Sequence, residues 1–393
     1  MSAARRAFGA NTVCIVDVIN LSSSADTLLR ERVLALRAKG VDNHIICIDG
    51  PYVRKLRAAG IPVATAHLPR GLNPFQLLRS LFEITAYLRR VKPDLVHTHC
   101  SVPGIVGRLA AKLAGVPVVV HTVHGFAFHD DSRGPLAALA IAIERFVGRF
   151  TDVLLSQNRE DLSRAVRLQI VPRGKARFIG NGIALEQFPP AAPRPDDDRR
   201  VVITCVARME PVKNHAMLLE AARLLHQSGA HFDLWLVGGG DGRARCEAIV
   251  AAANLGERVH FLGYRDDIPE VLAASDIGVL TSLKEGIPRA ALEAMAVGLP
   301  MVATRVTGTR EVVRDGDTGF LVDVDDPVAL AAALAVLIDD AGLRARMGAR
   351  GREVAFAEFD EADIVRELEH VYGESLGARG IVAPAERVQE ASA

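Results

Sequence analysis

The chain contains 393 residues, of which 49% are apolar and 5% are aromatic. Lysine plus arginine total 47, as do aspartate plus glutamate, so the overall charge gives no indication of a nucleic-acid partner. This length is too great for one ordinary hydrophobic core and predicts two domains. The five scattered cysteines form no CxxC pair, which favours reduced thiols in a cytosolic protein over a disulfide framework or a zinc site.

The sequence predicts neither a membrane-spanning helix nor a signal peptide. No apolar run reaches the roughly 18 residues that a spanning helix needs. The longest candidate, PLAALAIAIERF, is interrupted by Glu144. The N-terminal stretch MSAARRAFGANTVCIVDVIN has no apolar core followed by a cleavage site, so we expect it to lead into a first strand.

In the first half of the chain, short apolar runs alternate with longer helical patterns. The expected strands lie at 12–19, 44–49, 95–99, 116–123 and 153–157, and the expected helices include 25–39, 74–91 and 104–114. Strands that are apolar throughout and separated by helices predict a parallel sheet with helices on both faces.

A proline- and charge-rich stretch, FPPAAPRPDDDRR at 188–200, then interrupts the pattern and predicts a linker. Beyond it the alternation resumes. We expect strands at 201–207, 233–238, 259–263, 277–282, 301–304 and 319–322, and helices that end near 228 or span 242–254, 288–297 and 327–339. The expected fold is therefore two Rossmann-like, doubly wound α/β domains, at 1–187 and 201–357, with a loose tail at 378–393.

Ligands of open parallel sheets bind beyond the carboxyl ends of the strands, so the residues after each strand are the candidates. Arg208 and Lys213 follow the strand at 201–207, and a helix opens near Asn214. Two cations beside a helix N-terminus predict an anion site, although solvated surface residues would give the same pattern. Gly238 and Gly239 follow the next strand and would let a phosphate approach the backbone. The run fits neither GxGxxG nor GxxxxGK[ST], and a tight turn explains it equally well.

The stretch KEGIPRAALEAMAVGLP at 284–300 places two carboxylates in unlike surroundings. Pro288 suits the first helical position, which puts Glu285 in the preceding loop and Glu293 inside the helix. A surface ion pair between Arg289 and Glu293 is one interpretation. Because the other neighbours are small or apolar, we expect Glu293 to be partly enclosed and to bind a donor pair such as the hydroxyls of a ribose. Cations, glycines and this carboxylate share one sheet edge and together predict a nucleoside diphosphate site.

Histidines follow two strands of the first half: His97 and His99 in HTHC, and His121 and His124 in HTVHGF. No carboxylate joins them at ligand spacing, so we do not predict a metal site. His124, which precedes a glycine, is the histidine best placed to face a cleft.

Several of these motifs resemble a known family. VARMEPVKNH, LVGGGDG, KEGIPRAALEAMAVGLPMVAT and VVRDGDTGFLV closely resemble the donor half of retaining glycosyltransferase family 4. PDLVHTHCSVPGIVGRLAAKLAGVPVVVHTVHGF and IGNGI resemble its acceptor half, in the branch that builds bacterial exopolysaccharide, capsule and lipid-linked repeat units. The resemblance covers about residues 12–375.

The resemblance implies a GT-B fold with the donor cleft between the domains, retention of anomeric configuration and no requirement for a metal or other cofactor. Arg208 and Lys213 match the residues that hold the donor diphosphate, and Glu293 matches the glutamate that binds the ribose. Glu285 and His124 match the residues beside the transferred sugar. The family pattern adds expected donor contacts from Asn181, Gly238, Gly239, Gly286, Ile287 and Pro288.

Two further features follow from the resemblance. A final helix, here 358–377, is expected to cross back to the first domain. Where many relatives carry a Gly-Gly turn after the first strand, this chain has INLSSSADTLL at 19–29, whose serines can still bind oxygens.

The expected function is transfer of a sugar from a UDP- or GDP-sugar to a lipid-linked or oligosaccharide acceptor in cell-surface polysaccharide synthesis. A nucleotide-sugar epimerase of the same architecture and an inactive glycan-binding relative are the alternatives. The segment NPFQLLRSLFEITAYLRRVK at 73–92 mixes large apolar side chains with arginines and a lysine. It predicts either an interfacial helix on an anionic membrane or a packed helix with a basic outer face. The expected location is the cytoplasm, with peripheral contact at the inner face of the plasma membrane.

Overall fold

The computed structural model describes residues 12–69, 71, 73–126, 128, 134–190 and 200–381. The chain divides into two compact units, which are described separately: Met1–Ile179 with Val365–Ala393, and Gly180–Ile364. The division after Ile179 lies ahead of the linker expected at 188–200, of which 191–199 fall outside the described residues. Of the tail expected at 378–393, only 378–381 are described.

The first unit contains a seven-stranded sheet in the order β3-β2-β1-β4-β5-β6-β7, and every neighbouring pair is parallel. Its strands are β1 (Cys14–Val18), β2 (Asp42–Cys47), β3 (Val63–Thr65), β4 (Leu95–His99), β5 (Val118–Val123), β6 (Val153–Ser156) and β7 (Ala176–Phe178). The five longer strands are buried along their whole length, as expected for a sheet covered on both faces. The three-residue edge strands β3 and β7 were not predicted, because so short a run carries little periodicity.

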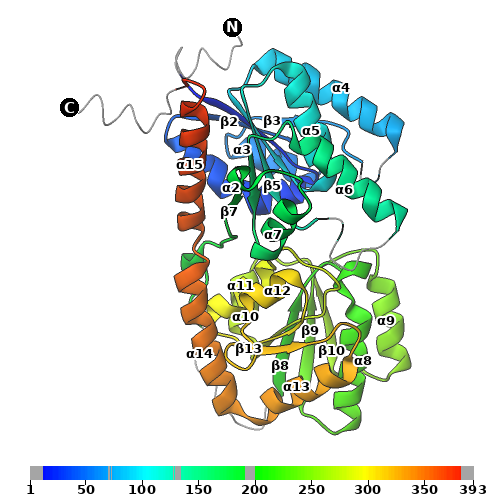
Figure 1. The fold of residues 1–393 in the computed structure, drawn as a ribbon. Coiled ribbons are helices and arrows are strands. Elements are labelled where there is room, and N and C mark those ends of the chain that lie inside the picture. The colour runs from blue at the N-terminus through cyan, green and yellow to red at the C-terminus, as the bar shows by residue number, and fades with distance from the viewer. Residues whose placement is uncertain are drawn as a thin grey trace, which may run out of the picture. The chain divides into compact units, whose positions relative to one another are not determined.

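Helices connect the strands of the first unit and cover its sheet (Figure 1). They are α2 (Ser22–Ala38), α3 (Pro51–Ala58), α4 (Pro74–Val91), α5 (Ser101–Ala114), α6 (Pro135–Gly148) and α7 (Arg159–Arg167), joined by the C-terminal part of α15 (Glu361–Gly377). Helix α2 begins three residues before the expected 25–39, so most of the INLSSSADTLL stretch is helical. From Val365 onward α15 belongs to the first unit.

The second unit repeats this architecture with six parallel strands in the order β10-β9-β8-β11-β12-β13. Its strands are β8 (Val201–Val206), β9 (Phe232–Val237), β10 (Val259–Gly263), β11 (Ile277–Leu280), β12 (Met301–Thr304) and β13 (Gly319–Val322). Its helices are α8 (His215–Gln227), α9 (Arg243–Ala252), α10 (Ile268–Ala273), α11 (Arg289–Val297), α12 (Thr307–Val312), α13 (Pro327–Asp339) and α14 (Ala341–Glu358). The prediction of two Rossmann-like, doubly wound α/β domains is confirmed.

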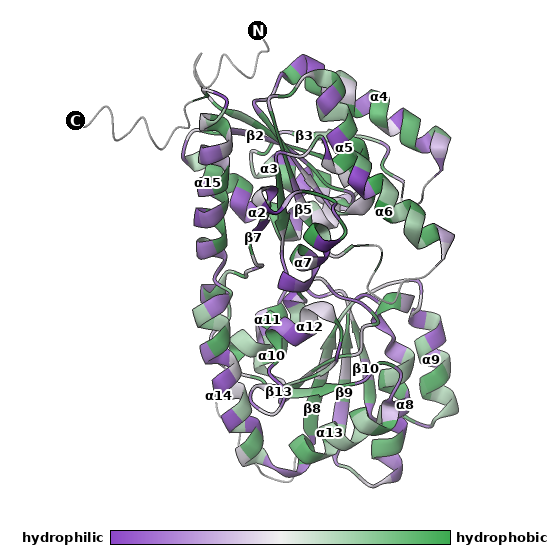
Figure 2. Cartoon of the chain, in the orientation of Figure 1, coloured by the Kyte–Doolittle hydropathy of each residue, from purple (hydrophilic) through white to green (hydrophobic). Residues whose placement is uncertain are grey.

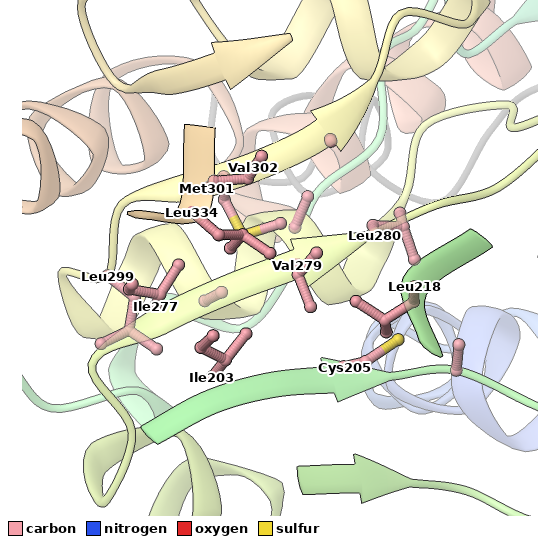
Figure 3. Close-up of a cluster of buried hydrophobic side chains, with 14 of the residues drawn as sticks. Ile203, Cys205, Leu218, Ile277, Val279, Leu280, Leu299, Met301, Val302 and Leu334 are labelled. Carbon is pink, nitrogen blue, oxygen red and sulfur yellow. The ribbon is translucent and has the colours of Figure 1, made fainter. Parts of the chain in front are cut away.

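The core of the second unit lies against the central strands β8, β11 and β12 (Figure 3). Side chains from these strands meet Leu218 of α8 and Leu334 of α13, all of them buried. Ile277 at the start of β11 is inaccessible to solvent. A rigid core directly beneath the carboxyl ends of β8 and β11 fixes the positions of the loops that follow them.

One helix boundary differs from the prediction. Pro288 was expected at the first helical position, but it is the N-cap residue of α11, which begins at Arg289. The helix ends at Val297, as expected, and the C-cap residue Gly298 has a φ of 97°, in the left-handed region that favours glycine.

Hydropathy differs between the strands and the helices (Figure 2). The strands are largely hydrophobic, whereas most helices alternate hydrophilic and hydrophobic positions along their length. Among the described helices, none combines the length and the apolar content that crossing a bilayer requires.

Candidate active site

Both sheets contain a point at which the strand order reverses, between β1 and β4 in the first unit and between β8 and β11 in the second. In doubly wound folds, ligands bind outside the carboxyl ends of the strands at such a point. In each unit a cluster of polar side chains lies at this position.

In the second unit, Lys213 and Glu285 form an ion pair across the strand reversal. Lys213 ends the short turn η3 (Pro211–Lys213) after β8, and its Nζ lies 2.6 Å from Oε1 of Glu285 in the loop after β11. Ser282 Oγ donates to the same oxygen at 2.5 Å. Thr281 Oγ1 donates to the carbonyl of Lys213 at 3.1 Å, which ties the two loops together. The fold therefore holds a cation and a carboxylate in fixed register on adjacent loops.

Arg208 is not part of this pair. It follows β8, its side chain is 54% exposed, and its Nη1 binds Oε1 of Glu210 at 2.7 Å. The two cations expected to share one anion site are thus held differently, with Lys213 20% exposed and paired with Glu285, and Arg208 largely in solvent. Because an exposed Arg-Glu pair contributes little to stability, Arg208 can exchange partners at low cost.

The glycines after β9 have distinct roles. Gly238 has a φ of +135°, and a Cβ there would lie 2.2 Å from the carbonyl oxygen of Ala207, so this position requires glycine for the turn. A Cβ on Gly239 would meet no atom within 4 Å. The turn interpretation accounts for Gly238, whereas only Gly239 has open space beside its backbone that an approaching phosphate could use.

The loop that contains Gly286, Ile287 and Pro288 is held from two sides. A Cβ built on Gly308 of α12 would lie 1.3 Å from the carbonyl oxygen of Gly286, so the loop backbone packs directly on that helix. On the other side, Asn181 Nδ2 donates to the carbonyl of Ile287 at 3.4 Å. Asn181 and the loop, expected from motifs about 100 residues apart, are therefore brought together. The spacing role of Gly308 was not predicted.

Glu293 lies within α11, where its side chain is 15% exposed. Its ion pair with Arg289, at 3.7 Å between Nε and Oε1, is too long for a hydrogen bond, and Arg289 also donates to the carbonyl of Gly182. Burial raises the pKa of Glu293, opposed by the nearby Arg289. The ion pair exists, but it leaves a mostly enclosed carboxylate without a hydrogen-bond donor in the described part of the chain, and a ligand role for Glu293 stays a prediction.

In the first unit, Asp17 lies at the centre of the polar cluster. It is fully buried on β1, and its oxygens accept hydrogen bonds from Arg32 of α2, from Asn43 Nδ2 at 2.8 Å and from His99 Nε2 at 2.9 Å. Burial raises the pKa of Asp17, but Arg32, His99 and Asn43 together hold it below its ordinary value. The prediction from sequence spacing that no carboxylate lies beside the histidines is therefore wrong. Asp17 lies about 80 residues upstream, and only the pairing of β1 with β4 brings it beside His97 and His99.

The expected site residue His124 follows β5 and contacts this cluster. Its Nε2 lies 3.2 Å from Nδ1 of His99, and the Gln157 side chain also hydrogen-bonds its ring. Burial lowers the pKa of His124 to about 3, so the ring is neutral at physiological pH. His97 is held separately, between Tyr372 of α15 and Thr122.

Two triads of the described residues bring three ligand atoms close enough to hold a metal, namely Asp17-His97-His99 and Cys14-Asp42-His44. In the first, Asp17 already accepts a hydrogen bond from the Arg32 guanidinium. A divalent cation there would be repelled by this fixed positive charge. We therefore interpret the first triad as part of a hydrogen-bond network.

Comparison with known proteins gives a consistent result. Residues 26–182 match the family model for a glycosyl transferase 4-like domain, and residues 191–354 match that for glycosyl transferases group 1. The chain is 34% identical over 341 residues to the UDP-Gal:alpha-D-GlcNAc-diphosphoundecaprenol alpha-1,3-galactosyltransferase of Escherichia coli, covering 83% of this chain and 87% of the relative. The chain belongs to glycosyltransferase family 4. It is accordingly a glycosyltransferase.

A second sequence relative and a solved structure support the same family and fold. It is 33% identical over 341 residues to the putative glycosyltransferase EpsD of Bacillus subtilis, covering 82% of this chain and 85% of that one. The crystal structure of Anabaena Alr3699/HepE in complex with UDP and glucose superposes with a TM-score of 0.76 at 20% identity and covers 91% of this chain and 98% of that chain. This likeness supports the GT-B fold. The relatives named here are transferases and lend no support to the epimerase alternative.

Three residues of the two candidate clusters could not be found from the sequence motifs. Asp17 appeared only as one polar residue within an apolar strand. Ser282, which binds Glu285, is one of many serines, and Gln157 is a lone amide after β6. A polar residue that interrupts a fully apolar parallel strand was the available signal for Asp17, since such a residue must be satisfied by neighbours.

Proposed function

We propose that this glycosyltransferase moves a sugar from a UDP-sugar to a hydroxyl of a lipid-linked glycan in cell-surface polysaccharide synthesis. The name of the Escherichia coli relative supports both substrates, since that enzyme takes UDP-Gal and a diphosphoundecaprenol-linked acceptor. The Anabaena structure contains UDP and glucose. A GDP-sugar is the alternative donor, and the assay below distinguishes the two.

The observation that carries the proposal is the Lys213-Glu285 pair at the strand reversal of the second unit. Glu285 binds the ammonium of Lys213 at the carboxyl edge of the sheet, where ligands of this fold bind. When the donor diphosphate arrives, Lys213 and Arg208 stabilise the negative charge that builds on the leaving group. Glu285 then lies free of Lys213, beside the transferred sugar, where it can accept hydrogen bonds from the sugar hydroxyls.

The remaining donor contacts follow from the same loops. Glu293 binds the two ribose hydroxyls, and the backbone at Gly239 admits the diphosphate. The loop 286–288, held by Asn181 and Gly308, sets the distance between the ribose and the sugar. His124 of the first unit contacts the transferred sugar, and the acceptor hydroxyl attacks on the face from which the diphosphate leaves, which retains the configuration.

We propose that the reaction needs no metal or other cofactor. Positive charge for the diphosphate comes from Lys213, Arg208 and the N-terminus of α8, which begins immediately after Lys213 and Asn214. Activity should therefore survive EDTA in full. A loss of activity in EDTA that Mg²⁺ or Mn²⁺ restores would contradict this.

The proposal is tested by incubating the full chain with a panel of UDP- and GDP-sugars, with and without an undecaprenyl-diphosphate-linked saccharide. We expect one UDP-sugar to be consumed with release of UDP only when the acceptor is present. Conversion of the sugar nucleotide without acceptor would indicate an epimerase. Neither binding nor consumption of any nucleotide sugar would overturn the proposal and favour an inactive glycan-binding relative.

A membrane location is the second part of the proposal. Helix α4 exposes Phe75 and Phe82, at 85% and 76%, and α6 exposes Leu136 at 81%. Helix α5 contacts both α4 and α6, so these side chains belong to one helical layer of the first unit. The last turn of α4 adds Arg89 and Arg90. Large apolar side chains beside arginines suit the interface of an anionic bilayer, and we propose that the enzyme is cytoplasmic and peripheral on the inner face of the plasma membrane.

Sedimentation with liposomes tests this surface. Wild-type chain should cosediment with vesicles that contain phosphatidylglycerol and much less with pure phosphatidylcholine. The double variant Phe75→Ser/Phe82→Ser should lose most of this binding. Phe356→Ser, which removes an exposed phenylalanine from α14 of the second unit, is the matched control and should bind as the wild type does. Equal binding by all three proteins would contradict the proposed surface.

A further inference from the structure

A continuous chain of hydrogen bonds links the buried end of β1 to the candidate sugar-binding histidine. Asp17 Oδ1 lies 2.9 Å from Nε2 of His99, and Nδ1 of His99 lies 3.2 Å from Nε2 of His124. Asp17 and His99 are both buried, whereas His124 is partly exposed. The chain therefore runs outward from the core to the carboxyl edge of the sheet, where ligands of this fold bind.

The chemistry of these groups fixes the position of each proton. An ionised carboxylate only accepts hydrogen bonds, so His99 must donate to Asp17 from Nε2–H. A neutral imidazole with its proton on Nε2 has an unprotonated Nδ1, which can only accept. His124 must then donate from its own Nε2–H, which leaves Nδ1 of His124 as the unprotonated nitrogen.

This assignment requires a neutral His99, and the surrounding charges support it. Asp17 and Arg32 form a buried pair of opposite charges whose sum is zero. An imidazolium at His99 would leave one net positive charge in the core, which is costly. Burial lowers the pKa of His99, opposed by Asp17 and assisted by Arg32. The other ionisable groups near it, His97, His121 and Tyr372, are neutral by the same effect of burial.

We infer that Asp17 and His99 are positioning residues that hold His124 in its neutral Nε2–H tautomer, so that Nδ1 of His124 is a hydrogen-bond acceptor. The side chain of Gln157, which also bonds this ring, then donates its amide N–H to Nδ1, and a substrate hydroxyl takes the place of that amide. The inference rests on the proposed function, in which His124 contacts the transferred sugar. An unprotonated Nδ1 accepts a hydrogen bond from a hydroxyl group of the substrate. In the other tautomer Nδ1 carries the proton and would donate a hydrogen bond instead.

Two observations distinguish this role from plain stabilisation of the core. Asp17 already has Arg32 and Asn43 as partners, so the fold does not need His99 to satisfy the carboxylate. Directly after His99, Cys100 adopts φ 63° and ψ 174°, a conformation that is close to glycine-only. Strain of this kind persists at functional sites, and here it turns the chain out of β4 at the point where His99 is held.

The tautomer can be measured directly in the unmodified protein. Two-bond ¹H–¹⁵N spectra of the full chain labelled with ¹⁵N-histidine distinguish protonated from unprotonated ring nitrogens. The His124 signals are assigned by their absence from a His124→Ala sample. We expect a protonated Nε2 and an unprotonated Nδ1 for His124 at neutral pH. A protonated Nδ1 would overturn the inference without reference to any activity.

Two variants of His99 then test whether its hydrogen bonds set the His124 tautomer and support turnover. In His99→Gln the side-chain amide can donate to Asp17 and accept from His124, as the imidazole does, whereas His99→Phe keeps a ring but makes neither bond. We expect His99→Phe to mix the tautomers of His124 and to lower kcat about tenfold or more, with little change in KM for the donor. His99→Gln should retain the tautomer and most of kcat.

Glu144→Gln is the matched control, because it disrupts another buried ion pair of the first unit, with Arg108 at 2.7 Å. It should reduce stability while leaving kcat and the His124 tautomer unchanged. Equal kcat in His99→Phe and wild type, or equal losses in His99→Phe and His99→Gln with both folded, would overturn the inference. If the wild type itself transfers no sugar, the proposed function fails, and the spectra still decide the tautomer.

Discussion

Replacing Glu293 by glutamine should weaken donor binding without weakening the fold. Burial raises the pKa of Glu293, so its folded-state value lies above its unfolded one and the folded chain favours the protonated acid. The ionised carboxylate therefore costs stability at neutral pH, and this cost fades as the pH falls through the folded pKa. A neutral amide removes the cost, and Arg289 keeps its hydrogen bond to Gly182.

The effect on binding follows from the number of acceptor oxygens. Glu293 offers two charged oxygens to the ribose hydroxyls, glutamine keeps one neutral oxygen, and alanine keeps none. Hydrogen bonds to charged groups contribute about 1.5–3 kcal/mol. We expect Glu293→Gln to lose about 1.5 kcal/mol of binding free energy and Glu293→Ala to lose about 3 kcal/mol. We therefore expect UDP affinity to fall about 10-fold and about 150-fold respectively.

Isothermal titration with UDP and thermal unfolding measure the two effects on the same samples. Glu353→Gln is the matched control, because Glu353 forms an exposed helix ion pair with Arg350 at 2.8 Å in the same unit. It should leave UDP affinity unchanged. An unchanged affinity in Glu293→Gln, accompanied by a small loss of stability, would refute the reasoning and show that the Arg289-Glu293 pair is an ordinary surface ion pair.

Three further predictions follow from other parts of the structure. Gly308→Ala should destabilise the second unit by about 1–3 kcal/mol in urea unfolding, because its Cβ would overlap the carbonyl of Gly286; an unchanged midpoint would contradict the close packing. Lys213→Met should lower kcat about 100-fold or more while the folded circular dichroism spectrum is retained, and near-normal turnover would exclude it from the leaving-group site. Burial lowers the pKa of His124 to about 3 and that of His215 to about 4, so only the unfolded chain takes up these protons below about pH 6.5. Stability should fall as the pH drops from 6.5 to 4, by up to about 1.4 kcal/mol per pH unit for each histidine, and a melting temperature that is flat over this range would contradict the burial.

The architecture was predictable because most strands are short apolar runs separated by helical patterns. The runs LVHTH and MVAT were both predicted as strands with the bounds that the structure shows. Both strands are buried along their whole length. The edge strands β3 and β7 were missed because three residues are too few to show a period. Pairing across a sheet cannot be read from periodicity either, and for that reason the contact between Asp17 and the histidines of β4 appears only in the structure.

The candidate site was predictable where its residues share a motif. Glu285, Gly286, Ile287 and Pro288 are consecutive, and their loop is held as one piece. The direct pairing of Lys213 with Glu285 was not predicted, because the residues lie 72 positions apart and each was assigned a separate ligand group. Physically, a free cation and a free carboxylate on adjacent loops pair with each other until a ligand displaces one of them.

The central claim, retaining transfer from a nucleotide sugar, is tested most directly by the anomeric configuration of the product. The full chain is incubated with an α-linked UDP-sugar and an undecaprenyl-diphosphate-linked saccharide, and the H1–H2 proton coupling within the transferred sugar ring is measured by NMR. We expect an α-linked product that forms only when the acceptor is present. A β-linked product, or an altered sugar nucleotide formed without acceptor, would contradict it.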